Sequence, residues 1–276
     1  MKIYNPNISG QSIGGGWTFQ RNFNKAMREY LDIEFVAKWQ DCDIFFISGS
    51  TMVNPDEIEA AKKNKKKIVL RVDNIPRNSR NRNTGTSRLF RYAQLADTVI
   101  YQSKWAKDYV GYFLKKEGTI IYNGVDTTIF NDQGREDGFK SIYLYVQYNR
   151  DENKRFPEAC DMFRAEWRKD NRSRLHLVGQ FSPELRDTNF DFFMGETIHY
   201  FGVITEPIVM AKIMKEADIL LYPSYSDALP NTVIEAVACG MEVRHRGHAG
   251  VGEAATMPDP SLERMGREYY ELFKKL

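Results

Sequence analysis

Residues 222–240 decide the fold, and they read Tyr-Pro-Ser-Tyr-Ser-Asp-Ala-Leu-Pro-Asn-Thr-Val-Ile-Glu-Ala-Val-Ala-Cys-Gly. The apolar run 219–222 is typical of a short buried strand, and two prolines indicate that 223–230 is a loop. From Val233 onward the residues are apolar or small, which predicts a buried helix. Strand, loop and helix in this order form the repeating unit of parallel α/β folds.

The loop opens onto the N-terminus of the predicted helix, where unpaired backbone N–H groups favour an anion such as a diphosphate. Asn231 and Thr232 are suitable capping residues for that end. Glu235, one turn into the helix, could accept hydrogen bonds from a ribose diol, and Asp227 on the loop could hold sugar hydroxyls. Taken alone, Asp227 could equally stabilise a turn, and Glu235 could be an ordinary surface residue of the helix.

Upstream, strands and helices alternate along the chain. Short apolar strands are predicted at 2–4, 33–36, 44–47, 67–72, 98–101 and 119–122. Helices are predicted near 17–30, 55–63, 86–96 and 104–114. This alternation predicts a parallel sheet covered by helices on both faces.

A polar, glycine-bearing segment, 131–138, interrupts the alternation and is the predicted linker. Beyond it, strands are predicted at 141–147, 174–178, 198–201 and 219–222, with helices near 157–168 and 209–216. The sequence therefore predicts an α/β protein with two Rossmann-like domains facing a cleft. The predicted ranges are 1–133 for the first domain, 139–258 for the second and 259–276 for a terminal helix.

Composition agrees with an ordinary soluble protein of two domains. The chain has 276 residues, of which 42% are hydrophobic and 28% are charged. No apolar stretch is long enough to span a bilayer, and residues 1–6 read as a strand rather than a signal peptide. Cys42, Cys160 and Cys239 form no Cys-x-x-Cys pair. We expect buried thiols and a cytoplasmic location.

The net charge of +2 is unevenly distributed. The lysine-rich run 62–67 is expected to end a surface helix before a buried strand. The basic loop 77–83, with Arg88 and Arg91 after it, has no apolar residues to bury and could meet an anion. An anionic lipid head group, a phosphate-bearing acceptor or nucleic acid would each suit it, so a peripheral membrane contact is one expectation and nucleic acid a less favoured one.

The stretch 227–240 resembles the donor-binding motif of family 4 retaining glycosyltransferases, in which Glu-Gly-x-Pro is followed at the same spacing by Glu-Ala-x-Ala-x-Gly. Pro230, Glu235 and Gly240 match in register, as do the two alanines between them. Downstream, residues 247–253 stand where that family has Gly-Gly-x-x-Glu. Asp227 departs from the motif, because it replaces the first Glu with a shorter acid that can reach different hydroxyls.

The resemblance covers most of the chain and implies a GT-B fold. It implies transfer of a hexose, with retention of configuration, from a nucleotide-diphosphate sugar of the UDP or GDP type to an acceptor hydroxyl of a glycan, glycolipid or other compound. It also implies no tightly bound cofactor, no metal and no dedicated base, and a terminal helix that crosses back to the first domain. Positioning and stabilisation of the leaving diphosphate would supply the rate.

The resemblance also assigns site residues. Family members place an Arg and a Lys after the first strand of the second domain, and the candidates here are Arg150, Lys154 and Arg155, although Gln147-Tyr148 replaces the usual Gly-Arg pair. With Asp227, the catalytic candidates are Arg150 and Lys154. The implied donor-binding residues are Gly14, Gly15, Gly16, Arg155, Leu229, Pro230, Asn231, Thr232, Glu235 and Gly250.

Three features keep alternatives open. The glycines at 14–16 could form a phosphate-binding loop or a plain turn. Arg71 and Asp73 leave the carboxyl end of a strand, where they could orient an acceptor hydroxyl or form a structural ion pair. Asp41-Cys42-Asp43 matches the Asp-x-Asp pattern of metal-dependent glycosyltransferases, but it leads directly into a buried strand and we reject it as a metal site.

Two other functions compete with glycosyl transfer. A nucleotide-sugar epimerase of the same fold would act without an acceptor. A non-catalytic module would use the basic loop to bind nucleic acid or an anionic surface. Stabilisation by a particular nucleoside diphosphate would favour an enzyme, and stabilisation by nucleic acid alone would favour the module.

Overall fold

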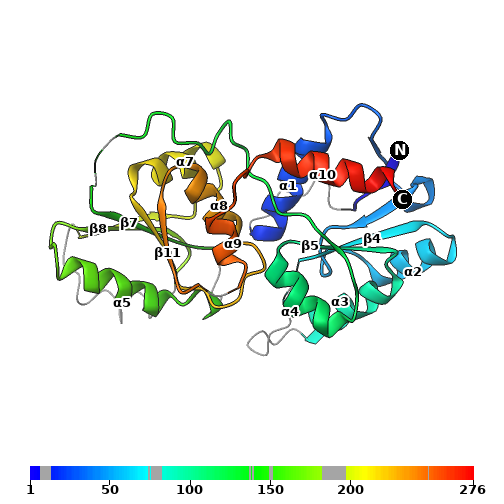
Figure 1. The fold of residues 1–276 in the computed structure, drawn as a ribbon, viewed down its shortest axis with the longest axis horizontal. Helices are drawn as coiled ribbons and strands as arrows, with labels where there is room; N and C mark the ends of the chain where they lie inside the picture. The colour runs from blue at the N-terminus through cyan, green and yellow to red at the C-terminus, as the bar shows by residue number, and fades with distance from the viewer. Residues whose placement is uncertain are drawn as a thin grey trace. The chain divides into compact units, whose positions relative to one another are not determined.

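The chain folds into two compact units (Figure 1). The computed structural model describes residues 1–6, 14–73, 75, 83–136, 138, 140–148, 152–181, 197–247 and 249–276, with the side chains of 83 and 84 left out. Unit 1 comprises Met1–Val125, Asp227–Asn231 and Pro258–Leu276, and unit 2 comprises Asp126–Ser226 and Thr232–Met257. The short segment Asp227–Asn231 thus joins unit 1, although the residues on both sides of it belong to unit 2.

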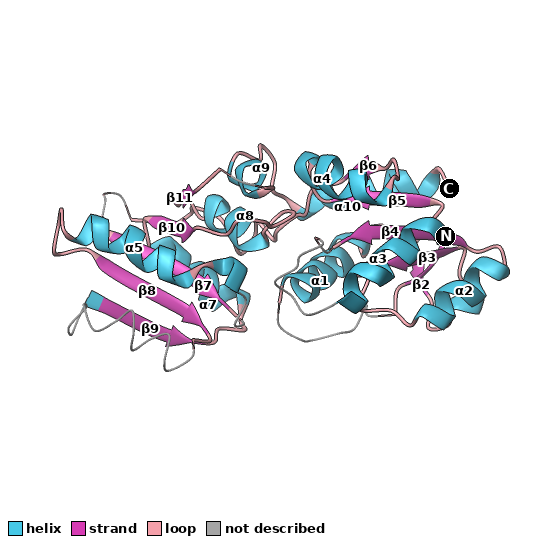
Figure 2. Ribbon diagram, turned by 90° about the horizontal axis from the view of Figure 1, so that it is seen from below, coloured by secondary structure: helices cyan, strands magenta, loops and turns pink. Residues whose placement is uncertain are grey.

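Unit 1 is built on a parallel sheet in the order β2-β1-β3-β4-β5-β6. Its strands are β1 (Lys2–Tyr4), β2 (Glu34–Phe35), β3 (Ile44–Ile47), β4 (Lys67–Val72), β5 (Thr98–Tyr101) and β6 (Thr119–Ile120). Its helices are α1 (Gly15–Met27), α2 (Pro55–Lys63), α3 (Asn83–Leu95), α4 (Lys104–Leu114) and α10 (Leu262–Lys274), with a 3-10 turn η1 (Trp39–Asp41) (Figure 2).

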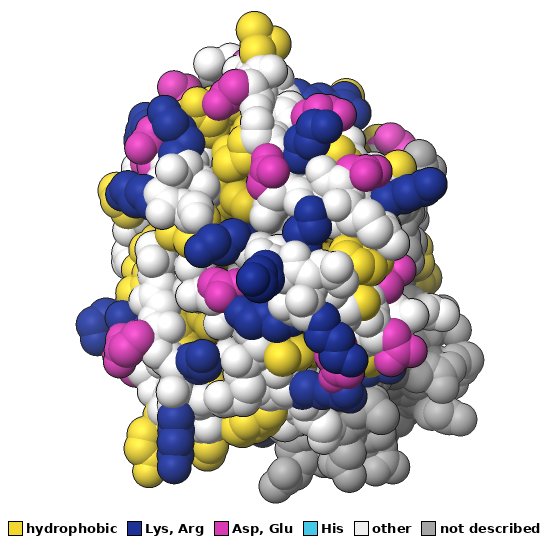
Figure 3. Space-filling model, turned by 90° about the vertical axis from the view of Figure 1, so that its right-hand side faces the viewer, with side chains coloured by type: hydrophobic (Ala, Val, Ile, Leu, Met, Phe, Trp, Pro, Cys, Tyr) yellow, Lys and Arg dark blue, Asp and Glu magenta, His cyan; other side chains and the backbone are white. Residues whose placement is uncertain are grey.

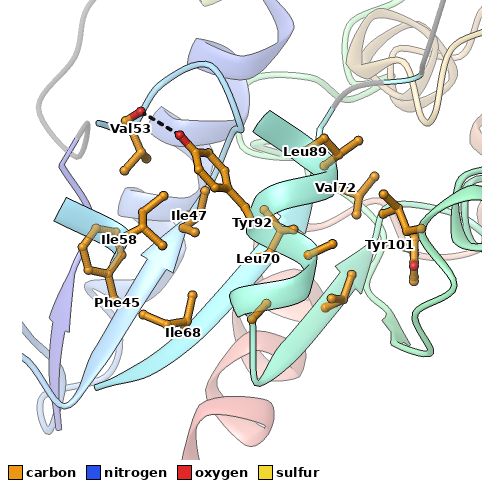
Figure 4. Close-up of a cluster of buried hydrophobic side chains, with 14 of the residues drawn as sticks. Phe45, Ile47, Val53, Ile58, Ile68, Leu70, Val72, Leu89, Tyr92 and Tyr101 are labelled. Atoms are coloured by element: carbon orange, nitrogen blue, oxygen red, sulfur yellow. Dashed lines mark hydrogen bonds between the residues drawn. The ribbon is translucent and has the colours of Figure 1, made fainter. Parts of the chain in front are cut away.

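The two faces of this sheet are covered by different helices, because side chains alternate along each strand. Phe45 and Ile47 of β3 face the layer of α2, α3 and α4, where the Tyr92 hydroxyl donates to the carbonyl of Val53 (Figure 4). Phe46 lies on the opposite face and packs against α1 and α10. There it meets Tyr269 of α10, at 5.7 Å between ring centres. The terminal helix therefore completes the core of unit 1.

Unit 2 holds a second parallel sheet, in the order β11-β10-β7-β8-β9. Its strands are β7 (Ile142–Gln147), β8 (Arg174–Gly179), β9 (Ile198–Gly202), β10 (Ile219–Tyr222) and β11 (Glu242–His245). The helices that follow them are α5 (Phe156–Trp167), α7 (Pro207–Glu216), α8 (Asn231–Ala238, its first residue in unit 1) and α9 (Val251–Ala255), with a 3-10 turn η2 (Glu152–Lys154). The predicted α/β architecture with two parallel-sheet domains is confirmed.

The segment predicted as a linker is attached to unit 2 over its described residues, 131–136 and 138. Arg135 donates to the carbonyl of Ala217 at 2.8 Å and lies 3.6 Å from the Asp218 carboxylate. Lys215 donates back to Asn131 at 2.9 Å. Arg135 of the segment and Lys215 of α7 therefore hold the segment against the C-terminal end of α7.

The surface charges that the structure describes are mixed in sign. Figure 3 shows Lys and Arg side chains interspersed with Asp and Glu on one face of the molecule. Arg91, expected beside the basic loop, forms an ion pair with Glu59 of α2. Residues 77–82 of that loop lie outside the described part of the chain. Within the described residues, no helix is both long and apolar enough to cross a membrane.

Gly179 is required by the register of β7 and β8. Its φ is +124°, and a Cβ there would lie 1.7 Å from the carbonyl oxygen of Gln147. We expect Gly179→Ala to lower the free energy of unfolding by about 2–4 kcal/mol, because strain and a backbone overlap add. Gly134→Ala is the control: the φ of Gly134 is +74°, but no heavy atom of the described residues lies within 4 Å of where its Cβ would stand, so about 1 kcal/mol is expected. Equal losses in urea unfolding would contradict this reading.

His176 makes unit 2 sensitive to acid. Burial, and secondarily the charge of His199, lowers the pKa of His176 from its ordinary value of 6.5 to about 4. Between these values the unfolded chain binds more protons, so stability should fall as the pH drops through this window. Because the ring is only partly buried, we expect a loss of about 1–2 kcal/mol. His176→Phe keeps the aromatic contact with Phe201, and a pH series of urea unfolding should show a flatter profile for this variant.

Candidate functional site

The carboxyl ends of the strands in unit 1 gather polar residues at one edge of the sheet, as they must in a parallel sheet. The residues that follow the strands there are Asn5 after β1, Ser48 and Ser50 after β3, Asp73 after β4, Gln102 and Ser103 after β5, and Asn123 after β6. Arg71, the fifth residue of β4, joins them. This edge is the candidate site of unit 1.

Gly14, Gly15 and Gly16 lie at the N-terminus of α1, which begins without a side-chain cap. Gly14 has a φ of +121°, and its carbonyl accepts from the N–H of Thr18 at 2.9 Å. Among the described residues, no heavy atom lies within 4 Å of where a Cβ on Gly14 or Gly15 would stand. The packing of the described residues therefore does not require a glycine at 15, which is exposed. The first N–H groups of a helix have no partner within the helix.

Arg71 is buried inside this edge, with only 2% of its surface exposed. Its guanidinium donates to the carbonyl of Ser48 at 3.0 Å and to Asn123 Oδ1 at 3.1 Å, and it lies 3.5 Å from the ring centre of Phe19. Burial lowers the pKa of Arg71, against the attraction of Tyr269 and Asp73. All these partners belong to the protein, so the geometry suits a supporting role better than direct contact with a ligand.

Asp73 lies next to this cation but is half-buried. Its Oδ1 accepts from the N–H of Ser50 at 2.9 Å. Burial raises the pKa of Asp73, and Ser50 and Arg71 oppose the shift. A carboxylate that is partly open and more basic than usual can accept a hydrogen bond from a hydroxyl.

Asn123 connects this edge with the segment Asp227–Asn231, which we call the anchored segment. Its Oδ1 accepts from Arg71, and its Nδ2 donates to Gln102 Oε1 at 3.0 Å, to the carbonyl of Leu229 at 3.3 Å and to Asn231 Oδ1 at 2.9 Å. Asn231 in turn donates to the carbonyl of Gly15 at 3.4 Å. The amide of Asn123 is thus the centre of a buried polar network.

Ser103 holds the same segment from a neighbouring strand end. Its hydroxyl donates to the carbonyl of Ala228 at 2.5 Å and accepts from the N–H of Ala106, which caps α4. Asp227, at the start of the segment, is half-buried, and Pro230 is buried. The loop on which the sequence predicts sugar contacts is therefore fixed to unit 1.

In unit 2, the loop after β7 is joined to the loop after β10. Asn153 of η2 donates to Ser224 Oγ at 2.7 Å and to the carbonyl of Ser226 at 3.2 Å, and its Oδ1 accepts from Ser226 Oγ at 3.0 Å. Three hydrogen bonds from one side chain close the two loops together at the carboxyl ends of adjacent strands.

The next residue, Lys154, is held by the same neighbour. Its ammonium donates to the hydroxyl of Tyr222 at 2.5 Å, and its carbonyl accepts from Tyr145 at 2.9 Å. Tyr222 is the last residue of β10, and only 3% of its surface is exposed. The Tyr222 hydroxyl thus fixes the Lys154 ammonium at the carboxyl edge of the sheet. A charged donor in a fixed position forms strong hydrogen bonds with an anionic group.

Arg155 makes the third contact between the loop after β7 and the loop after β10. It has a left-handed φ of 55°, stacks 4.0 Å from the ring centre of Tyr225 and is paired with Glu158. This ion pair raises the pKa of Arg155. Arg246 lies 3.8 Å from the other oxygen of Glu158. One acid therefore shares its charge between two cations.

Glu235 lies on the second turn of α8 and is half-buried, and Thr232 lies one turn earlier. The helix ends in a Schellman motif, in which the N–H of Met241 donates to the carbonyl of Ala236 at 3.0 Å and Gly240 takes a φ of +77°. Gly250 is buried and precedes α9. The Gly250 turn and the carboxylate of Glu235 thus come from successive strand–helix units.

Most predicted site residues lie in one of these two groups, except Arg150, which is outside the described part of the chain. Sequence analysis assigned no site role to Asn153, Tyr222 and Glu158 in unit 2, or to Gln102, Ser103 and Asn123 in unit 1, although residues 123–126 resemble the segment that ends the first domain in the family. A signal existed for several of them, because Gln102, Asn123 and Tyr222 stand at or just after the end of a predicted strand.

The second acid of the Asp-x-Asp sequence before β3 is bound to the backbone of β1. Asp43 Oδ2 accepts from the N–H of Lys2 at 2.7 Å, and Cys42 is buried. In the part of the chain that the structure describes, no three His, Cys, Asp or Glu side chains come together as a metal site would require.

Comparison with known proteins identifies the class of fold. Residues 141–250 match the model of the family Glycosyl transferases group 1. No curated protein matches the chain by sequence. The structure is that of a GT-B protein, with two parallel-sheet α/β domains.

Three solved structures illustrate the likeness. Sucrose-phosphate synthase from Thermosynechococcus elongatus is 14% identical over 99% of this chain and 89% of its own, with a TM-score of 0.66. The pneumococcal O-GlcNAc transferase GtfA, in complex with UDP and GlcNAc, is 10% identical over 84% of this chain, with a TM-score of 0.63. A Listeria monocytogenes structure named as a UDP-N-acetylglucosamine 2-epimerase is 15% identical over 93% of this chain and 70% of its own, with a TM-score of 0.52. The chain spans only 56% of the pneumococcal enzyme.

Two variants test the hydrogen bonds that Asn153, after β7, makes with Ser224 and Ser226, after β10. Ser226→Ala removes one bond and should cost about 1 kcal/mol in the free energy of unfolding. Asn153→Ala removes all three and leaves polar groups without their partner, so about 2–3 kcal/mol is expected. Urea unfolding followed by a unit 2 signal measures both, and a smaller loss in Asn153→Ala than in Ser226→Ala would contradict the geometry.

Proposed function

We propose that this protein is a glycosyltransferase that moves a hexose from a nucleotide-diphosphate sugar to an acceptor hydroxyl with retention of configuration. One observation carries the proposal: the family match over 141–250 includes Lys154, Arg155 and Glu235, which come from the loop after β7 and from α8. The UDP in the pneumococcal structure supports a UDP-type donor, and GDP is the alternative.

In this proposal the donor is held by groups with different charges. Glu235 accepts hydrogen bonds from the ribose diol. Lys154, fixed by Tyr222, neutralises the diphosphate as it leaves. Arg155 shares Glu158 with Arg246, so its contribution to the diphosphate is the smaller one.

The anchored segment and unit 1 supply the remaining groups. Asp227 binds sugar hydroxyls, while Leu229, Pro230, Asn231 and Thr232 shape the loop and the start of α8. The N–H groups at Gly14, Gly15 and Gly16 offer hydrogen bonds to a phosphate oxygen. Asp73, whose pKa is raised by burial, orients the acceptor hydroxyl, and Arg71 supports it from inside. Positioning and charge stabilisation then supply the rate, without a metal.

A panel of UDP, GDP and ADP tests the donor site. One of them should raise the melting temperature, since a ligand at 100 times its Kd stabilises by about 2.7 kcal/mol. Glu235→Ala should weaken that nucleotide about 10- to 100-fold, because it removes hydrogen bonds to a charged group. Glu206→Ala, an exposed acid at the start of α7, is the control and should bind normally.

The proposal fails if no nucleotide of the panel stabilises the protein. Stabilisation by nucleic acid alone would favour the binding module instead. For the nucleotide that binds, NMR of the product formed from its sugar reports the anomeric configuration, and inversion would remove the retaining assignment.

The second candidate is a nucleotide-sugar epimerase, favoured by the likeness to the Listeria structure. An epimerase converts its nucleotide sugar without an acceptor. Incubation with the nucleotide sugar alone, followed by NMR, separates the two: a ring-carbon isomer indicates the epimerase, and slow release of free sugar and nucleoside diphosphate indicates the transferase.

A further inference from the structure

We infer that Asn123 is a positioning residue that holds the anchored segment, and with it Asp227, in the geometry needed for sugar transfer. The inference rests on the proposed function, because it concerns the same donor loop. Asn123 lies at the carboxyl end of the sheet in unit 1, and neither the motif nor the family match over 141–250 includes it.

The first argument is the number of groups that depend on one amide. Asn123 is 3% exposed, and its Nδ2 reaches three acceptors, two of which, the Leu229 carbonyl and Asn231 Oδ1, belong to the anchored segment. The amide has only two N–H hydrogens, so these acceptors share them. Any residue without a donor here would leave buried oxygens of the segment unpaired.

The second argument is that the amide is polarised in the direction of the segment. Arg71, a buried cation, donates to Asn123 Oδ1 at 3.1 Å. Drawing electron density toward the oxygen makes the N–H groups stronger donors, and the chain continues through Asn231 to the carbonyl of Gly15. The charge of Arg71 thereby strengthens the hydrogen bond from Asn123 to Leu229, which lies 106 positions further along the chain than Asn123.

The third argument is that a second, independent anchor acts on the adjacent residue. Ser103 donates to the carbonyl of Ala228, so the carbonyls of Ala228 and Leu229 are both fixed, and Asn231 is fixed through its side chain. With three of the five residues of the segment held, Asp227 has little backbone freedom. A carboxylate that must meet particular sugar hydroxyls gains rate from such preorganisation.

The inference predicts different effects on turnover of the nucleotide sugar and on binding of the nucleoside diphosphate. Lys154 and Glu235, the two side chains to which most of the nucleotide binding is assigned, belong to unit 2 and lie outside the anchored segment, and Lys154 is held by Tyr222. Loosening the anchored segment should therefore reduce turnover of the nucleotide sugar much more than binding of the nucleoside diphosphate. A general loss of structure would reduce both together.

Asn123→Asp is the test variant, because aspartate keeps the size and the oxygen that pairs with Arg71 but cannot donate to Leu229 or Asn231. Ser103→Asp keeps an acceptor for the cap of α4 and removes the donor to Ala228. In hydrogen exchange, we expect amides of 228–231 to exchange at least about tenfold faster in Asn123→Asp, with β4 and β5 unchanged. We expect kcat/KM for the nucleotide sugar to fall about tenfold or more, and the Kd of the nucleoside diphosphate to change less than about threefold.

Each outcome decides. Unchanged exchange in 228–231 would overturn the anchoring role, and changed exchange with unchanged kcat/KM would overturn its link to transfer. Equal losses in kcat/KM and in nucleotide binding would also overturn the inference, since they indicate a merely structural role. If the wild type binds no nucleoside diphosphate, the proposed function and the link to transfer fail, while the exchange result still decides whether Asn123 anchors the segment.

Discussion

The buried guanidinium of Arg71 is the constraint on which unit 1 depends. A cation with 2% exposure must have partners, and it finds them on separate parts of the chain: the Ser48 carbonyl after β3, the ring of Phe19 on α1 and the amide of Asn123 after β6. Tyr269 of α10 contributes electrostatically. Because an unpaired buried charge is costly, these elements must come together around it, and the edge of the sheet is fixed as a result.

In unit 2, the side chains that hold the edge of the sheet together are neighbours in sequence. Residues 153–155, which follow β7, contact residues 222–226 at and after the end of β10. Asn153 makes three hydrogen bonds, Lys154 makes one and Arg155 makes a stacking contact. Since β7 and β10 are adjacent parallel strands, their ends lie side by side and the loops can pair residue by residue. Two cations are thereby held at one edge of the sheet, the edge at which the proposed function places the diphosphate.

The sequence predicted the elements well where burial dictates composition. Strand 44–47 is a continuous apolar run, and 99–101 of β5 is fully buried, because both faces of the sheet are covered there. By contrast, the edge strand β11 is half-exposed and mostly polar. The positions of Glu235 and of the glycines at the start of α1 also follow from the local sequence pattern. The burial of Arg71 could not be predicted, because it depends on Phe19 and Tyr269, far away in the chain. The same holds for the pairing of Ser103 with Ala228, which are 125 residues apart.

That long-range pairing bears on the residue that departs most from the family motif. Ser103 and Asn123 fix the carbonyls of Ala228 and Leu229, so the backbone beside Asp227 cannot shift outward to make up for a short side chain. A Glu at this position would carry its carboxylate one methylene further from the same backbone. Under the proposed function, the side-chain length at 227 therefore selects which sugar hydroxyls are met, and the rigidity of the anchored segment turns one missing methylene into a preference for the donor sugar.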